Sequence, residues 1–377
     1  MRKKQAGFTL METMVSLVVL LGVSAIVMSG LVQMMWTQGT ITNRTEMHTS
    51  VRSATELLQQ EIGQAGKISL PTPPAGVAWA MTTPVAINVN IGLITQAVTF
   101  NVFDGVGNPV LYEGEWVTVD TGLNKEAVQL TCGAGPGNCQ LPSNAWTATF
   151  YYNHVPGAIL GTGTIGVPIS IPGAFSGGII PPAAGVMPAP PAGYAGYPDF
   201  PAGYPVAPAL NNGSTGTVLK LFGDVNGDGN LVYVEYTCVP GTPANPGFLY
   251  RNQVNFWDNQ VVPPLDPSMI VLTGVLTNPN DANGNAVPCF NYQLQTKEGV
   301  NAAAKDLAFV TDVAVTLTVQ TASPDPETHQ LQTETKALLN VSPRNVYDAY
   351  DFATLDYANR IQPTPPLIKA NILINYQ

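Results

Sequence analysis

The chain has 377 residues, a formal net charge of −10 and only 11% charged residues, and it contains 36 glycines and 33 prolines. At this length it can form one sizeable core or two modest domains. The acidic charge balance argues against a general nucleic-acid-binding protein, which needs a basic face. Few charges combined with abundant glycine and proline indicate a surface made largely of uncharged loops, which suits an exported, β-rich protein.

The first element in chain order is a long apolar segment near the N-terminus. A basic segment, Met1–Ala6, precedes the sequence Gly7–Glu12, and no charged residue occurs from Thr13 to Asn43. Within this stretch Met14–Trp36 is mostly Val, Leu, Ile, Met, Gly and Ala, and it is long enough to cross a bilayer as one helix. Basic residues before the helix favour an orientation in which the bulk of the chain faces the periplasm or the exterior.

Glu12 is then a carboxylate at the mouth of a membrane helix, where an unpaired charge is costly and a partner is expected. If the chain is cut after Gly7, the new α-amine on Phe8 lies four residues before Glu12. That amine is one turn away on the same helix, and on a neighbouring copy it could meet the carboxylate inside an apolar bundle. Either pairing offsets part of the desolvation cost. A secretory signal peptide normally has a shorter apolar core, and a simple signal anchor gives no reason for Glu12.

This arrangement resembles the class III signal of type IV pilins and type II secretion pseudopilins. Those families have a short basic leader, Gly before the cut, usually Phe after it, and Glu as the fifth mature residue. The matching residues here are Arg2, Lys3, Lys4, Gly7, Phe8 and Glu12. The resemblance implies cleavage after Gly7 by prepilin peptidase, N-methylation of Phe8, and packing of the helix into a filament core in which Phe8 and Glu12 set the subunit register.

The helical pattern continues beyond the apolar segment. Small and large apolar residues recur at three- and four-residue steps, at Val51, Ala54, Leu58, Ile62 and Ala65, with Arg52, Glu56 and Glu61 on other faces. Gly66 and Pro71 are expected to stop the helix. The sequence therefore predicts a leader at 1–7, a transmembrane or filament-core helix at 8–36, an amphipathic helix at 37–68 and a β-rich head at 69–377.

The head shows short runs with two-residue periodicity, separated by turn residues, which predict an antiparallel β region. The expected strands are 85–91, 97–103, 116–120, 127–132, 145–152, 217–222, 231–237, 269–276, 290–295, 308–320 and 331–341. The predicted fold class is α+β, with a long N-terminal helix packed on an antiparallel β-rich globular head. The first 66 residues and the last 35 or so look like those of PilW-type minor pilins and, more distantly, the J-type pseudopilin.

A stretch dominated by Pro, Gly and Ala, from 156 to 216, interrupts the strands and repeats Pro-Ala-Gly-Tyr at Pro191–Tyr194 and Pro201–Tyr204. Such a composition predicts an extended or irregular surface excursion rather than a conventional core. It is either a tolerated insertion or an adhesive or subunit-contact surface, because its aromatic residues offer area without charge.

The four cysteines lie beyond the membrane segment, where disulfides can form. They allow three pairings, and we favour Cys132 with Cys139, which flank a turn-rich stretch, and Cys238 with Cys289. A metal site is the competing interpretation, but no Cys-x-x-Cys motif or nearby histidine supports it.

One constellation suggests ligand chemistry, because residues 224–235 fit the calcium-loop spacing D-x-N-x-D-G-x5-E. Asp224, Asn226 and Asp228 would supply side-chain oxygens, Asn230 a backbone carbonyl and Glu235 a bidentate carboxylate. The flanks are predicted strands, so this is not a helix-loop-helix EF-hand, and a polar hairpin connection is the alternative. Asp281-Ala-Asn283-Gly-Asn285 is a weaker match of the same kind.

No catalytic motif stands out, and the scattered His48, His154 and His329 are expected on the surface or on the helix rather than in a catalytic set. The predicted function is therefore structural: a minor pilin without enzyme activity or nucleic-acid binding. Its expected partners are prepilin peptidase and other pilins, and its expected location is the inner membrane before assembly and the pilus afterwards. A type II secretion pseudopilin and a filament-tip adhesin are the alternatives.

Overall fold

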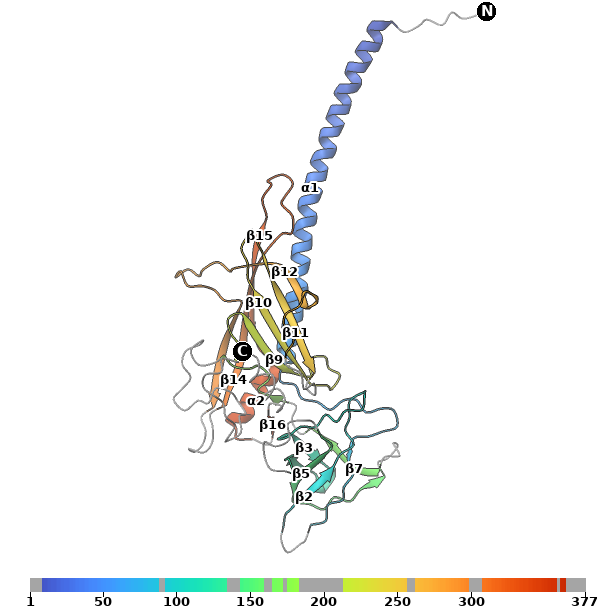
Figure 1. Cartoon of the computed structure of the whole chain (residues 1–377), viewed down its shortest axis with the longest axis vertical. Coiled ribbons are helices and arrows are strands. Elements are labelled where there is room, and N and C mark those ends of the chain that lie inside the picture. Colours follow the sequence, from blue (N-terminus) through green and yellow to red (C-terminus); the bar gives the residue numbers. More distant parts are fainter. Residues whose placement is uncertain are drawn as a thin grey trace, which may run out of the picture.

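A computed structural model describes residues 9–87, 92–133, 143–158, 165–171, 175–182, 213–255, 262–297, 307–357 and 360–363 of the chain. One long helix, α1 (Leu10–Gln64), projects from a β-rich head, and its N-terminal end lies far from that head (Figure 1). This arrangement confirms the predicted α+β fold, in which a long N-terminal helix packs on an antiparallel β-rich globular part.

Helix α1 runs without a break for 55 residues, a length of about 80 Å. It ends where the sequence predicts, because Ala65 leaves the helical geometry and Gly66 adopts a φ of +78°. A Cβ at Gly66 would lie 2.7 Å from the backbone oxygen of Ser176, so the backbone conformation and the close approach both require glycine. The chain can therefore turn sharply at this point and enter the head.

The larger sheet of the head lies along the C-terminal part of α1 (Figure 1). Its strands are antiparallel in the order β13-β14-β12-β11-β10-β9, and β15 also pairs with β14. They are β9 (Val218–Gly223), β10 (Val232–Val239), β11 (Gly247–Asn255), β12 (Ile270–Leu276), β13 (Phe290–Lys297), β14 (Leu307–Gln320) and β15 (Thr333–Val341). The predicted apolar stripe of the helix is buried against this sheet at Val51, Ala54, Leu58, Ile62 and Ala65.

A second hydrophobic core is formed by residues that lie between α1 and β9 in the sequence, and it is centred on Phe100, Trp146 and Phe150. A five-stranded sheet has the order β1-β7-β3-β4, with β6 also paired to β7, and β2 and β5 form a separate antiparallel pair. The strands are β1 (Ala80–Met81), β2 (Ile94–Thr99), β3 (Trp116–Val119), β4 (Glu126–Gln129), β5 (Ala145–Phe150), β6 (Gly157–Ala158) and β7 (Ile165–Ser170). Two short 3-10 helices are η1 (Gly122–Asn124) and η2 (Pro267–Met269).

A short C-terminal helix, α2 (Arg344–Thr354), has no counterpart among the elements expected from the sequence. It buries Val346, Ala349 and Ala353 in a small cluster with Phe309 of β14. The parallel pair β8 (Phe175–Ser176) and β16 (Ile361–Gln362) lies next to this helix. The C-terminal part of the chain is thereby fastened to the larger sheet.

The expectation of an irregular excursion over 156–216 is wrong for its first part. Strands β6, β7 and β8 fall within it, and Val167 and Ile179 are buried. The physical reason is that Ile165–Ser170 keeps enough apolar residues to add a strand between β1 and β3. The Pro-Ala-Gly-Tyr repeats lie outside the residues that the structure describes.

Candidate functional site

The N-terminal part of α1 exposes a continuous apolar surface. Every residue from Leu10 to Gln38, here called the free half, is exposed, and Leu17, Ile26 and Met34 are 58%, 74% and 69% accessible. Soluble monomers rarely leave so much contiguous apolar area in water. The free half is roughly 45 Å long, enough to cross a hydrocarbon core of about 30 Å. By length and composition it qualifies as a membrane-spanning helix.

Glu12 lies in the first turn of α1 and is held by a reciprocal cap. The Thr9 backbone N–H and hydroxyl both donate to Glu12 Oε2 at 3.1 Å, and the Glu12 N–H donates to Thr9 Oγ1 at 3.4 Å. A carboxylate at a helix N-terminus is also favoured by the helix dipole. Glu12 is therefore partnered within its own turn, yet it stays exposed for contacts with another chain. Gly7 and Phe8 lie outside the described residues.

The free half ends where the β14–β15 hairpin reaches the helix. A Cβ at Gly39 would lie 2.8 Å from Cγ of Pro326, and Asn43 Nδ2 donates to the backbone oxygen of Ser323 at 3.4 Å. Nine residues further along the helix than Gly39, His48 Nδ1 lies 2.9 Å from a carboxylate oxygen of Glu334 on β15. From Gly39 onwards the head thus contacts one face of α1, and we call Gly39–Gln64 the bound half.

Glu61 occupies the buried face of the bound half, which corrects its expected place on another face. Arg251 Nε of β11 donates to its two carboxylate oxygens at 3.0 and 3.1 Å, and the Tyr236 hydroxyl of β10 donates at 2.6 Å. Burial is the largest single effect on Arg251 and lowers its pKa. The hydrogen bonds and the charge of Glu61 together outweigh burial, so the pKa of Arg251 lies above its usual value. Burial, followed by the Glu61 charge, raises the pKa of the Tyr236 hydroxyl.

Sequence reasoning missed Arg251 and Tyr236, although a signal for such partners exists. Glu61 follows Leu58 by three residues and precedes Ala65 by four, so all three lie on one face of the helix. A charge within a buried apolar stripe requires a buried counter-charge. The exposed pair Arg52–Glu56, at 2.7 Å, lies on another face as expected.

The predicted calcium-loop residues do not all come together. Asp224 is buried and Asn226 and Asp228 are exposed in the turn between β9 and β10, and Asn230 follows them. Glu235 lies within β10, where its carboxylate accepts a hydrogen bond from the Tyr233 hydroxyl at 2.8 Å. The alternation of β10 turns Val234 and Tyr236 into the core shared with α1 and directs Glu235 to the other face. This geometry does not support Glu235 as a twelfth-position ligand.

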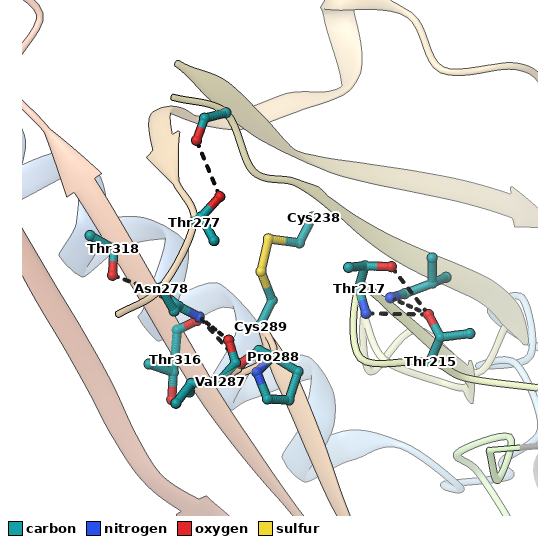
Figure 2. The surroundings of a disulfide bond; sticks show 12 residues. Thr215, Thr217, Cys238, Thr277, Asn278, Val287, Pro288, Cys289, Thr316 and Thr318 are labelled. Atoms are coloured by element: carbon teal, nitrogen blue, oxygen red, sulfur yellow. Dashed lines mark hydrogen bonds between the residues drawn. A yellow bond between two sulfur atoms is a disulfide. The ribbon is translucent and has the colours of Figure 1, made fainter. Parts of the chain in front are cut away.

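Among the residues that the structure describes, no group of three or more His, Cys, Asp or Glu side chains is placed to hold a metal ion. Cys238 and Cys289 form a disulfide with a Cα–Cα distance of 6.5 Å, which ties β10 to the start of β13 (Figure 2). Beside it, Asn278 Nδ2 donates to the backbone oxygens of Pro288 and Thr316 (Figure 2). Cys132 is disulfide-bonded too, and its expected partner Cys139 lies outside the described residues.

The histidines differ from expectation at one position. His48 on α1 and His329 in the turn between β14 and β15 are exposed, but His154 is completely buried, beside Phe150 of the second hydrophobic core. Its Nδ1 lies 3.0 Å from Asp120 Oδ2 and its Nε2 lies 2.7 Å from Glu126 Oε1. Glu126 also accepts the Tyr151 and Tyr152 backbone N–H groups, so this cluster cross-links β4 with the chain after β5.

The N-terminal segment matches the family model of the prokaryotic N-terminal methylation motif over residues 2–32. Neither the search of curated proteins nor that of solved structures found a match to this chain. The matched motif is of the prepilin type, and it implies processing by prepilin peptidase and assembly with pilins. It indicates a type IV pilin-like or pseudopilin-like structural protein, and the uncovered free half of α1 fits a membrane-anchored protein of this kind.

Proposed function

We propose that this chain is a minor pilin: a membrane-inserted precursor that is cut after Gly7, methylated on Phe8 and built into a type IV pilus through the free half of α1. The observation that carries the proposal is the exposed apolar helix whose first turn, within the matched motif, contains the carboxylate of Glu12. An apolar surface of this length needs a cover outside the monomer.

Two apolar environments would surround the free half in succession. Before assembly a bilayer surrounds it, with the head on the periplasmic side, and after assembly the helices of neighbouring pilins take the place of lipid. In the filament the α-amine of Phe8 on a neighbouring chain would pair with Glu12, whose carboxylate is exposed and, among the described residues, accepts hydrogen bonds from Thr9. A pair formed in an apolar surrounding is sensitive to register, because a misplaced copy leaves a buried charge unpaired.

Mass spectrometry of sheared surface filaments and of the remaining membranes tests the processing step. We expect the filaments to yield a peptide that begins at Phe8 and carries one methyl group on its α-amine. The same peptide confined to membranes would favour a pseudopilin. An intact Met1 terminus in both fractions would overturn the proposal.

A matched pair of variants on α1 tests the role of Glu12. Glu12→Gln keeps the cap geometry but removes the charge, so we expect the chain to remain in membranes and to disappear from sheared filaments. Glu56→Gln is the control, because Glu56 is exposed on the bound half and pairs with Arg52, one turn away on the same helix. If both variants enter filaments as the wild type does, the charge of Glu12 has no role in assembly.

A further inference from the structure

The turn between β9 and β10, residues 224–230, forms part of the junction where α1 enters the head. The Asp224 backbone N–H donates to the Lys67 carbonyl oxygen at 2.8 Å, just after the end of α1. Gly229 has a φ of +85°, and a Cβ there would lie 2.4 Å from the Leu70 carbonyl oxygen. This turn is therefore packed directly against residues 67–71, the segment that leads out of the helix.

Two side-chain oxygens in this turn are buried without a hydrogen-bond partner. They are Asp224 Oδ1 and Asn230 Oδ1, and only one other buried side-chain atom among the described residues, Gln320 Oε1, shares that condition. Asp224 is 1% exposed. Its second oxygen, Oδ2, is engaged by Lys67 Nζ at 3.1 Å and by the Ser69 hydroxyl. A buried acceptor left unsatisfied destabilises the folded state, and the penalty is larger if the group is charged.

We propose that this turn binds a calcium ion through Asp224 Oδ1 and Asn230 Oδ1, with Asn226 and Asp228 completing the site from the solvent side. All four groups are oxygen ligands, which a hard cation prefers, and Ca²⁺ tolerates the irregular geometry of such a turn better than Mg²⁺. Glu235 has no part in this site, and Asn230 contributes its side chain rather than the backbone carbonyl expected from the spacing. The inference is independent of the filament role.

A second turn of similar composition shows what such a sequence does when its oxygens are satisfied internally. Asp281 Oδ1 accepts the Asn283 and Asn285 backbone N–H groups at 2.9 and 2.8 Å, and its Oδ2 accepts from Asn285 Nδ2 at 3.0 Å. This exposed carboxylate therefore needs no ion to satisfy its oxygens. The Asp281 turn provides a matched control within the same chain.

The charges set the expected affinity. Asp224 and Asp228 contribute two negative charges, and Lys67 reduces the local charge by its contact with Asp224. A calcium site with few carboxylates belongs with the weak extracellular class, with Kd of about 10⁻⁴ to 10⁻³ M. Because the turn is packed on residues 67–71, an ion bound there braces the exit of α1 from the head.

Calorimetric titration of the full chain in detergent micelles, freed of divalent ions by a chelator, tests the site with CaCl₂ and, separately, with MgCl₂. We expect one saturable Ca²⁺ per chain, weaker binding of Mg²⁺, and a rise in melting temperature of about 2–4 °C at saturating Ca²⁺. Asp228→Asn, at an exposed position, should weaken Ca²⁺ binding about tenfold, the effect of losing one charged ligand. Asp224→Asn should do so at least as strongly, and Asp281→Asn should leave it unchanged.

Two results would overturn the calcium proposal. One is the absence of saturable heat up to about 10 mM CaCl₂, well above the range of weak sites. The other is equal Ca²⁺ affinity in the Asp228→Asn and Asp281→Asn proteins. In Asp224→Asn, Lys67 loses its charged partner and the protein can fail to fold. Asp228 is exposed, so Asp228→Asn should retain the fold, which its circular dichroism spectrum checks.

Discussion

The two halves of α1 are one uninterrupted helix but differ in where their stabilising contacts come from. The bound half buries Leu58 and Ile62 completely against the larger sheet, whereas every residue of the free half is exposed. The space around the glycines of the two halves also differs. A Cβ at Gly39 would clash with Pro326, whereas a Cβ at Gly22 would meet nothing described within 4 Å. The free half is therefore shaped by surroundings outside the monomer, and the bound half by the head.

The acidic residues of the two halves show the same contrast. Glu12 is satisfied by a residue of its own turn, so its charge is available to another chain. Glu61 is satisfied by Arg251 and Tyr236, which come from two strands of the sheet. A charge held by local contacts can change partners during assembly, whereas a charge held by tertiary contacts fixes the helix on the head.

The largest effect is expected from breaking the Glu61 ion pair. Glu61→Ala leaves Arg251 with most of its side chain buried and without its counter-charge, which should lower the free energy of unfolding by about 3–5 kcal/mol. Glu56→Ala breaks an exposed pair and should cost less than about 1 kcal/mol. Chemical denaturation of the chain in detergent gives both values. Adding Arg251→Met to Glu61→Ala should restore part of the stability, and a failure to do so would show that the charge itself is not the cause.

A pair of leucine substitutions compares the halves directly. Leu58 is 0% exposed, so Leu58→Ala should cost about 3 kcal/mol through lost burial and the cavity left behind. Leu21 is 61% exposed, so Leu21→Ala should change the unfolding of the head by less than about 0.5 kcal/mol. The same denaturation experiment measures both. Equal destabilisation by the two variants would contradict the division of α1 at Gly39.

A third test concerns a titrating carboxyl of the head. Glu115 is buried beside Tyr112, whose backbone N–H donates to it at 3.1 Å, and burial raises its pKa to about 8, against the opposing effect of that hydrogen bond. The folded state then retains a proton that the unfolded chain releases near pH 4.5. This contribution to stability is complete below about pH 4.5, is lost as the pH rises toward 8, and is constant above that.

Melting curves at pH 5 and pH 8 measure this dependence. On the order of 3 kcal/mol of unfolding free energy should be lost over the interval, and Glu115→Gln should lose that much less than the wild type. The comparison with the variant isolates this carboxyl from the other titrating groups. If the two proteins show the same pH dependence, Glu115 is already ionised in the folded state.

Much of this architecture follows from the sequence because its patterns are regular. The apolar stripe from Val51 to Ala65 predicts the buried face of α1, and the two-residue alternation predicts most strands of the larger sheet. Strand β11 is missed because Arg251, Asn252 and Gln253 interrupt the alternation at its centre. Arg251 pairs with Glu61, which is distant in sequence, so the sequence around β11 does not itself explain a charge at the centre of a strand.

The other omissions have similar causes. Helix α2 is only 11 residues long and follows Pro343, and its fully buried residues are one valine and two alanines, so it is not assigned as an element from the sequence. The turn at 224–230 is identified by its composition, but the direction of Glu235 depends on which face of β10 meets α1. That face is set by tertiary packing, although the apolar residues at Val234 and Tyr236 indicate it once β10 is assigned.

The smallest effect is expected at the N-terminal end of the free half. Thr9→Ala removes the hydroxyl that accepts from the Glu12 N–H and donates to its carboxylate, at a cost of about 0.5–1 kcal/mol to the first turn. Hydrogen exchange of the full chain in detergent should show faster exchange in the first turn only, with Thr9→Ser as the control that keeps a hydroxyl. Exchange in the head should not change, because the free half ends before the head begins to cover α1 at Gly39. Faster exchange around Leu58 would mean instead that the two halves are energetically coupled.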